Sequence, residues 1–324
     1  MPVFRILFPV IVFVISSCGT KDKLPEKPDG EGMRVSGYLL SQQSWADDMK
    51  DIDLKSVTDL NLAFFNPAPD ASFAANAALA AGITAAHNEG VRVYMSIGGG
   101  LPPSHLADLI KADKRDMFIS SILAFAKEYG FDGIDVDLEN SLINEDYAPF
   151  VLALSKAIKP QGLRMTAALA SWNGNQVHDS ILKLYDFINI MSYDKTGPWS
   201  PERPGQHSPY TMVENDFTYY HEQRGIPAER LLVGLPFYGY GFGNGAPESM
   251  TYKSIVASYT GAADKDSVVL PAGGIIYYNG TGTIRKKTRF AISKKAAGVM
   301  IWQLKGDAKD DKSLLKAIHE EMKH

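Results

Sequence analysis

The stretch FDGIDVDLEN, residues 131–140, concentrates acidic side chains in a segment that otherwise has the composition of a buried strand. Glycine and apolar residues fill most of the gaps between its acids, which are Asp132, Asp135, Asp137 and Glu139. In a β-strand, successive side chains point to opposite faces of the sheet. Asp135, Asp137 and Glu139 would therefore share one face. Asp132 has the opposite parity, and we expect it to be structural and to bond to loop backbone at the strand entrance.

Three acids on one buried face could supply acid–base chemistry. Ionising several carboxyl groups two residues apart on a buried face carries a large free-energy cost. We therefore expect at least one shared proton and a coupled titration. A carboxyl group that stays protonated near neutral pH can serve as a general acid, and Glu139, the last in the row, is the candidate. The alternating apolar residues disfavour a solvent-facing acidic edge. The stretch also lacks the spacing of a calcium-binding loop, so no metal or other cofactor is expected.

Short apolar runs alternate with longer amphipathic segments from residue 34 onward. We expect strands at residues 34–40, 57–64, 91–97, 131–138, 163–170, 187–193, 231–236 and 298–302, with helical segments that include 115–129, 146–159, 212–224 and 286–297. Eight alternating units predict an α/β fold, the (β/α)8 TIM barrel, with Glu139 at the C-terminal mouth where barrel active sites are built. An open doubly wound sheet is the alternative, but no GxGxxG motif opens a helix.

The interval between the seventh and eighth expected strands is longer than the others. It contains TYKSIVASY at residues 251–259 and GGIIYYNG at residues 273–280. Because this excess is rich in aromatic residues, we expect a small inserted subdomain at about residues 239–280 rather than one long loop.

The N-terminus has the pattern of an export signal. Arg5 precedes an apolar run at residues 6–15, which is too short to span a bilayer, and small residues lead to Cys18. The pattern resembles a bacterial lipobox and implies a signal peptide at 1–17, a lipidated Cys18 with a flexible Pro- and Gly-rich tether at 18–32, and a barrel domain at 33–324. An ordinary signal peptide with an incidental cysteine is the alternative. Lipidation implies attachment to the bacterial cell envelope, at the outer membrane or cell surface.

Composition narrows the possible partners. Cys18 is the only cysteine of the 324 residues, so the chain can form no internal disulfide. The formal net charge of −4 gives no sign of a nucleic-acid-binding surface. We expect no nucleic-acid partner, a monomer, and contact with a membrane through the lipid anchor alone.

Several ordered motifs together resemble glycoside hydrolase family 18, which contains chitinases and related endo-β-N-acetylglucosaminidases. DGIDVDLE at 132–139 is similar to the DxxDxDxE signature of the family, and Ser96-Ile97-Gly98-Gly99 to its SxGG motif. Met191-Ser192-Tyr193-Asp194 matches MxYD, LLVGLPFYG at 231–239 matches the strand-seven segment of chitinases, and Trp302 matches the tryptophan beneath the −1 sugar. The resemblance extends from about Val35 to Asp307.

The resemblance implies a retaining mechanism in which the substrate's own acetamido group is the nucleophile. Glu139 would protonate the glycosidic oxygen and later deprotonate water, and Asp137 would orient the acetamide N–H. Asp135 would share a proton with Asp137, supported by Ser96 and Tyr38.

The remaining implied roles concern sugar binding. Tyr193 would donate to the acetamido oxygen, Asp194 would contact the same sugar, Trp302 would stack beneath it, and Met191 would line the pocket. Candidate aromatic platforms at strand ends or in mouth-side loops are Phe65, Trp172, Trp199 and Tyr238, for each of which plain packing is equally compatible. No partner can be identified for His207 from the sequence, and we expect no catalytic role for it.

The substrate remains open at this level. The expected ligand is an oligo- or polysaccharide of β-1,4-linked N-acetylglucosamine, cleaved in the manner of a chitinase. An endo-β-N-acetylglucosaminidase acting on the chitobiose core of N-glycans would use the same acids. An inactive sugar-binding member is disfavoured because Glu139 is present. Asn140 departs from the aromatic residue that follows the acid in many chitinases, and the short insertion suggests a shallow cleft suited to short or soluble chains.

Overall fold

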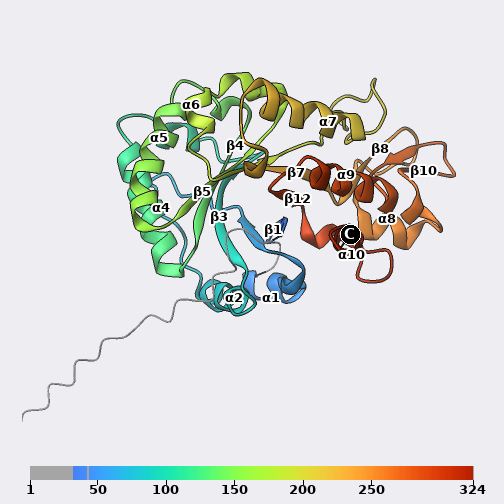
Figure 1. Ribbon diagram of the computed structural model, residues 1–324, viewed down its shortest axis with the longest axis horizontal. Coiled ribbons are helices and arrows are strands. Elements are labelled where there is room, and N and C mark those ends of the chain that lie inside the picture. The colour runs from blue at the N-terminus through green and yellow to red at the C-terminus, as the bar shows by residue number, and fades with distance from the viewer. Residues whose placement is uncertain (1–31, 42–43, 324) are drawn as a thin grey trace, which may run out of the picture.

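The strands of the protein close into a barrel. A computed structural model describes residues 32–41 and 44–323, so the expected signal peptide and Cys18 lie outside the described residues. Eight parallel strands form the barrel in the order β1-β12-β7-β6-β5-β4-β3-β2 (Figure 1). They are β1 (Arg34–Leu40), β2 (Asp59–Ala63), β3 (Arg92–Gly99), β4 (Gly133–Leu138), β5 (Arg164–Leu169), β6 (Phe187–Ile190), β7 (Leu231–Pro236) and β12 (Gly298–Trp302). The predicted (β/α)8 fold is confirmed.

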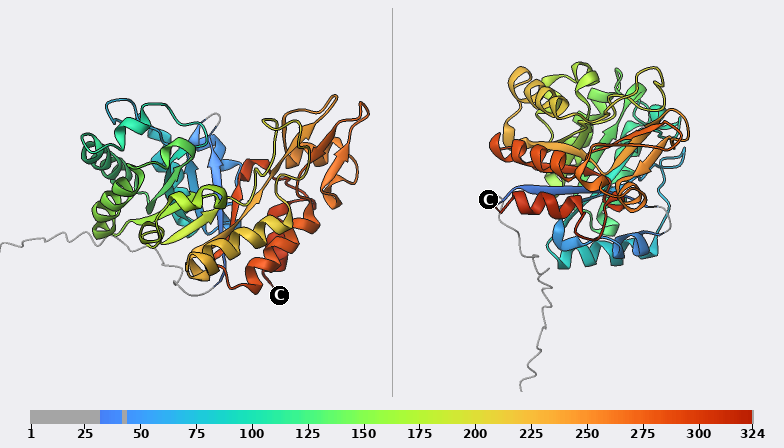
Figure 2. Two further views of the ribbon diagram at one scale, coloured as in Figure 1. Left: turned by 90° about the horizontal axis from the view of Figure 1, so that it is seen from above. Right: turned by 90° about the vertical axis from the view of Figure 1, so that its right-hand side faces the viewer.

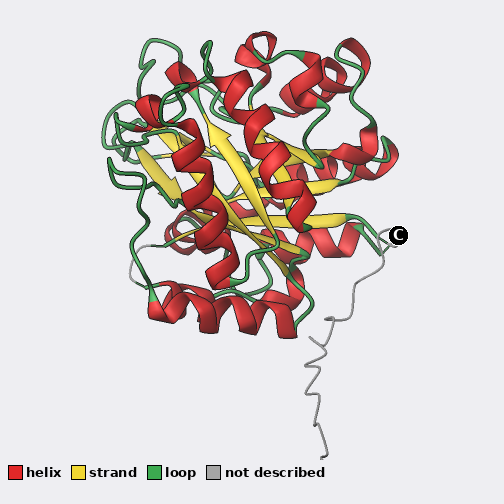
Figure 3. Ribbon diagram, turned by 90° about the vertical axis from the view of Figure 1, so that its left-hand side faces the viewer, coloured by secondary structure: helices red, strands yellow, loops and turns green. Residues whose placement is uncertain are grey.

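Helices surround the strands on the outside of the barrel (Figure 3). They are α1 (Trp45–Lys50), α2 (Ala77–Asn88), α3 (Leu106–Leu109), α4 (Arg115–Tyr129), α5 (Tyr147–Ile158), α6 (Asp179–Leu182), α7 (Tyr210–Thr218), α9 (Thr281–Ser293) and α10 (Leu314–Glu321). Helix α4 ends at Gly130, whose φ of 81° suits the left-handed conformation that glycine adopts without strain. Within residues 32–41 and 44–323, no helix is both long enough and apolar enough to cross a membrane.

The alternation of β4 separates two packed layers. Ile134, Val136 and Leu138 are fully buried in the large core between strands and helices. Asp135 and Asp137 are buried on the opposite face, toward the barrel axis, where a smaller apolar cluster includes Tyr38 and Met300. The parity expected from the sequence is therefore observed.

Asp132 lies at the entrance of β4 and acts as a structural residue. Its Oδ2 accepts a 2.7 Å hydrogen bond from the backbone N–H of Val93 and lies 2.9 Å from Nε2 of His87. Both partners belong to the neighbouring α2 and β3. This placement agrees with the expectation that Asp132 bonds to backbone at the strand entrance.

An inserted unit separates β7 from β12. It contains β8 (Tyr238–Phe242), β9 (Ser249–Thr251), α8 (Tyr252–Ser258), β10 (Ser267–Val269) and β11 (Ile275–Tyr277). The four strands form an antiparallel sheet in the order β10-β11-β8-β9. The unit projects from one side of the barrel, as the orange ribbon shows (Figures 1 and 2). Its first strand begins two residues after β7, so the base of the insertion lies at the mouth of the barrel.

Candidate active site

The acid ladder runs along β4 toward the barrel mouth. In the parallel pairing of β3 with β4, Ser96 is level with Asp135 and Gly98 is level with Asp137. Glu139 follows the last residue of β4 and is partly buried. Asn140, the next residue, has a φ of 52° and begins the turn that carries the chain away from the mouth. The end of the strand thus leaves Glu139 at the rim, with the two aspartates beneath it.

Asp135 is held by hydrogen bonds from four side chains. Its Oδ2 accepts from the Ser96 and Tyr38 hydroxyls at 2.7 and 2.8 Å. Its Oδ1 accepts from the Thr166 hydroxyl at 2.6 Å and from Nδ2 of Asn189 at 3.3 Å. Burial raises the pKa of Asp135, and these hydrogen bonds oppose the rise.

Thr166 and Asn189 were not identified from the sequence. Thr166 is paired with Asp135 across the β4–β5 ladder, and Asn189 lies on the next strand, β6. The available signal was Asn189 within the otherwise apolar β6, and Thr166 among the apolar residues that follow Arg164 in β5. Ser96 and Tyr38 lie where they were expected, as direct donors to Asp135.

Asp137 is buried behind Glu139 and interacts with that acid. Both oxygens of Asp135 accept from neutral donors, and a proton shared between Asp135 and Asp137 stays a prediction. Burial, followed by the charges of Glu139 and Asp135, raises the pKa of Asp137 well above its usual range. The raised pKa favours the protonated form of Asp137, which can donate to the Glu139 carboxylate.

Glu139 titrates near neutrality. Burial, and after it the negative charge of Asp194, raise its pKa to about 7, while the hydrogen bond from Asp137 opposes that rise. A carboxyl group with this pKa is partly protonated at neutral pH and can both give and take a proton. The arrangement places one acid–base group at the rim and a protonated partner directly behind it.

Aromatic rings form the floor beside the acids. The ring of Trp302 stacks on Phe64, with centroids 5.7 Å apart and an interplanar angle of 23°, and lies 5.5 Å from the ring of Tyr38. Met191 packs against the same inner cluster. An indole ring at the mouth of a barrel can stack on the face of a sugar ring, because both surfaces are flat and largely apolar.

Tyr193 lies among the acids. It is buried, and its hydroxyl is 3.8 Å from Sδ of Met300. Burial, followed by the charges of Asp137, Asp194 and Glu139, raises its pKa well above the usual range. Tyr193 thus stays a neutral hydroxyl that can donate a hydrogen bond. Strand β6 ends at Ile190, so the whole Met191–Asp194 motif lies in the following loop and not in the strand expected to reach residue 193.

Phe65 does not line the site, and its assignment as a sugar platform is wrong. Its ring packs outside the barrel against Trp45, Phe125 and Phe131, at centroid distances of 5.1, 5.6 and 5.4 Å. Phe64 faces inward instead. Strand β2 ends at Ala63, and both Ala63 and Phe64 belong to the inner cluster. The alternation of the strand therefore stops before Phe65.

Asp194 joins the site to the insertion. Its side chain is 42% exposed and accepts a hydrogen bond from the hydroxyl of Tyr238, the first residue of β8. His207, for which no partner could be identified from sequence, is fully buried with Nδ1 3.4 Å from Oδ1 of Asp194. Tyr238, considered from sequence as a sugar platform, thus contacts Asp194 directly.

Two tryptophans expected as platforms lie on the surface. Trp172 is 65% exposed in the turn after β5, and Trp199 is 58% exposed in the loop after β6. The ring of Trp199 meets that of Tyr240 edge-on, with centroids 5.3 Å apart. Their exposure leaves both rings available for stacking, and their role as platforms stays a prediction.

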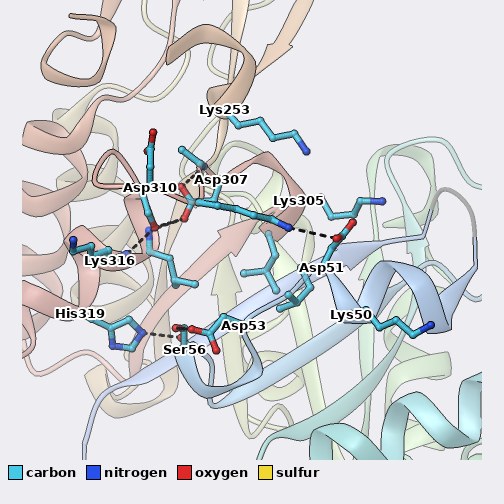
Figure 4. A pocket seen from close by; sticks show the side chains of 16 residues that line it. Lys50, Asp51, Asp53, Ser56, Lys253, Lys305, Asp307, Asp310, Lys316 and His319 are labelled. Atoms are coloured by element: carbon cyan, nitrogen blue, oxygen red, sulfur yellow. Dashed lines mark hydrogen bonds and ion pairs between the residues drawn. The ribbon is translucent and has the colours of Figure 1, made fainter. Parts of the chain in front are cut away.

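A separate cavity of about 670 Å³ lies on the flank of the barrel (Figure 4). The α1–β2 connection, the segment after β12 and helix α10 line it. Lys309 pairs with Asp51 at 3.4 Å across it, and Nε2 of His319 lies 2.8 Å from the Ser56 carbonyl oxygen. Asp135, Asp137 and Glu139 are not among the residues that line this cavity, so it is distinct from the candidate active site.

Comparison with known proteins places the chain in a family. The model of Glycosyl hydrolases family 18 matches residues 34–307. The chitinase ChiB from the chitin utilization locus of Flavobacterium johnsoniae is similar with a TM-score of 0.80 and 33% identity, covering 90% of this chain and 94% of that one. A chitinase from Bacteroides thetaiotaomicron has a TM-score of 0.78 and 29% identity, with 90% and 97% covered.

A curated relative agrees with these structures. Chitinase A1 of Niallia circulans is 26% identical over an alignment of 287 positions, which covers 68% of this chain and 41% of that protein. The chain thus spans less than half the length of that relative. The match of the family model over most of the barrel, together with the acid ladder on β4, shows that the chain belongs to glycosyl hydrolases family 18.

Proposed function

We propose that the protein is a retaining glycosidase that hydrolyses β-1,4 bonds between N-acetylglucosamine units of chitin-type oligo- or polysaccharides. The observation that carries this proposal is the acid ladder of β4, with Asp135 and Asp137 buried on the inner face and Glu139 at the barrel mouth. The chitinases among its relatives support the same substrate class.

The first step cleaves the glycosidic bond. Protonated Glu139 donates its proton to the glycosidic oxygen as the bond from that oxygen to C1 breaks. The acetamido carbonyl oxygen of the −1 sugar forms a bond to C1 from the opposite face, which gives an oxazolinium ion and a free alcohol on the leaving sugar. Asp137 turns from Glu139, points its proton toward the Asp135 carboxylate, and accepts the acetamide N–H on its other oxygen.

The second step restores the enzyme. The Glu139 carboxylate takes a proton from water, whose oxygen attacks C1 and reopens the oxazolinium ring. Two inversions at C1 give net retention. Because the substrate provides the nucleophile, one acid–base carboxyl at the rim suffices.

The surrounding residues hold the reacting sugar. The Tyr193 hydroxyl, kept neutral by burial, donates to the acetamido oxygen and orients it toward C1. Trp302 supports the ring from below, and Asp194 contacts the same sugar from the loop after β6. Asp135, fixed by four donors, places negative charge beneath Asp137 when that group turns.

The substrate class can be tested with two substrates. We expect wild-type protein to convert chitotetraose mainly to chitobiose and to leave a high-mannose glycoprotein intact, with Glu139→Gln inactive on both. Release of the glycan from the glycoprotein would instead assign an endo-β-N-acetylglucosaminidase. Survival of both substrates would overturn the assignment as a glycosidase. We also propose a preference for chitooligosaccharides over crystalline chitin, which the relative rates on the two substrates would test.

We further propose that the protein acts as a monomer attached to the bacterial cell envelope through a lipid on Cys18. The support is the sequence alone: Arg5, the apolar run at 6–15 and the single cysteine that follows it. Wild-type protein should incorporate a radiolabelled fatty acid and partition into detergent, and Cys18→Ser should do neither. Labelling of Cys18→Ser would contradict the proposal, and light scattering of the soluble domain would test the monomer.

A further inference from the structure

His207 lies in a tightly held part of the loop between β6 and α7. The backbone N–H of Lys195 donates to the His207 carbonyl oxygen at 2.9 Å. The neighbouring Ser208 hydroxyl donates to the Ser192 carbonyl oxygen at 2.6 Å, and Nζ of Lys287 donates to the Ser208 carbonyl and hydroxyl oxygens at 2.7 and 2.6 Å. The loop is therefore fixed on both sides of the imidazole.

The two ring nitrogens of His207 both face oxygen acceptors. Nε2 lies 3.3 Å from the carbonyl oxygen of Tyr238, which can only accept, so Nε2 carries a proton. Nδ1 lies 3.4 Å from Oδ1 of Asp194. A hydrogen bond at Nδ1 as well as at Nε2 requires a proton on each nitrogen. The two contacts together fit an imidazolium ring paired with the Asp194 carboxylate.

The environment of the imidazole leaves little room for water. His207 is fully buried, and the rings of Tyr238 and Tyr240 lie 4.9 and 5.0 Å from it. The titratable groups in contact with the ring are thus Asp194, Tyr238 and Tyr240. Charge–charge interactions are stronger in such a low-dielectric site than in water.

The pair is electrostatically linked to the acid. The charge of Asp194 is the second-largest cause, after burial, of the raised pKa of Glu139. The other titratable groups that interact with Glu139 are Asp137 and Tyr193. A protonated imidazole beside Asp194 would offset part of the negative charge that reaches Glu139.

We propose that His207 is a positioning residue for the glycosidase reaction: it holds the Asp194 carboxylate at the sugar-binding face and sets the charge that Glu139 experiences. This inference rests on the proposed function. The loop holds the His207 imidazole in place, and the Tyr238 carbonyl oxygen of the insertion contacts its Nε2. The charge of Asp194, in turn, acts on Glu139.

The test replaces the imidazole by a neutral group. In His207→Gln the amide N–H can still reach the Tyr238 carbonyl, but no positive charge faces Asp194. We expect kcat on chitotetraose to fall about 10- to 100-fold, because Asp194 loses the fixed imidazole and keeps the Tyr238 hydroxyl as its donor. The basic limb of the pH profile of kcat/KM should move upward by about half a pH unit to one pH unit, because an uncompensated Asp194 favours protonated Glu139.

A matched control separates this role from folding. His221→Gln removes another imidazole whose Nδ1 lies 2.9 Å from a backbone carbonyl oxygen, that of Ile226, and whose ring lies beside Phe217. His221→Gln should leave kcat and both limbs of the pH profile of kcat/KM unchanged. Circular dichroism should show that His207→Gln and His221→Gln are both folded. A fall in kcat for His207→Gln with an unmoved basic limb would mean a merely structural role and would overturn the proposal. Unchanged kinetics would overturn it as well.

A second measurement is independent of turnover. Nitrogen-15 NMR of the histidine rings at pH 7, with His207 assigned by the signal lost in His207→Gln, should show both of its nitrogens protonated. In Asp194→Asn it should show one. A single protonated nitrogen in wild type would overturn the His207–Asp194 pair. If wild type cleaves neither substrate but shows the doubly protonated ring, the proposed function fails and the pair stands.

Discussion

Replacing Glu139 should stabilise the protein at alkaline pH while abolishing its activity. Glu139 has a pKa of about 7 in the folded protein, against an ordinary value of 4.5, chiefly because it is buried. A pKa difference of one between the folded and unfolded states corresponds to about 1.4 kcal/mol, so the ionised carboxylate costs the fold about 3 kcal/mol. Glu139→Gln keeps the size of the side chain and removes the charge.

The pH dependence has a definite sign. The folded pKa is raised, so the folded protein binds more protons than the unfolded chain between about pH 4.5 and pH 7. The wild type therefore loses free energy of unfolding as the pH rises through this window, and the whole loss is present above pH 7. Below pH 4.5 the carboxyl is neutral in both states and contributes nothing.

Urea denaturation at pH 4 and pH 8 measures this difference. Glu139→Gln should exceed the wild type by about 2 to 3 kcal/mol at pH 8 and match it at pH 4. Its kcat on chitotetraose should fall at least about 100-fold, as expected when a general acid is removed. Glu128→Gln, on the exposed side of α4, is the control and should show no pH-dependent difference. An equal stability change at both pH values would refute the assignment of a costly buried charge to Glu139.

Three further predictions follow from individual contacts. Phe64→Ala should raise KM for chitotetraose because it removes the ring stacked on Trp302. Phe65→Ala should leave KM unchanged and lower the free energy of unfolding by roughly 3 kcal/mol. The reverse pattern would contradict the inward face assigned to Phe64 and the outward face assigned to Phe65. Thr166→Val should cost about 1 to 3 kcal/mol in urea denaturation at pH 7, because Oδ1 of Asp135 loses its 2.6 Å donor; an unchanged midpoint would count against that bond. Burial lowers the pKa of Lys287 to about 7, so between about pH 7 and 10.4 the unfolded chain binds more protons than the folded protein. The free energy of unfolding of the wild type relative to Lys287→Met should therefore rise with pH in this window, by at most about 1.4 kcal/mol per pH unit. A difference that does not change with pH would contradict this titration.

The acid ladder could be predicted from sequence because one local rule determines it. Side chains alternate along a strand, and the apolar residues of β4 leave its acids only the inner face. The barrel followed from eight such strands separated by helical segments. The structural role of Asp132 could be predicted in the same way. A polar residue at a strand entrance that does not share the face of the other acids has only backbone and neighbouring loops to contact.

Residues beyond the strand ends could not be placed in this way. Phe64 rather than Phe65 faces Trp302, since the alternation of β2 ends at Ala63. Asn189 reaches Asp135 from 54 positions along the chain, through a register that only the closed sheet defines. Cys18 and the tether are outside the described residues, so the lipid anchor remains a prediction.

The insertion contributes to the site through its base rather than its tip. Tyr238, at the start of β8, donates to Asp194, and its carbonyl directs His207. The preceding residue, Phe237, donates its backbone N–H to the Trp302 carbonyl oxygen at 2.8 Å, which ties the base to the aromatic floor. Val269, at the end of β10, is by contrast 71% exposed. Changes at Val269 should therefore leave the catalytic step unaffected, whereas changes at Phe237 or Tyr238 should alter the position of Asp194 and the chemistry itself.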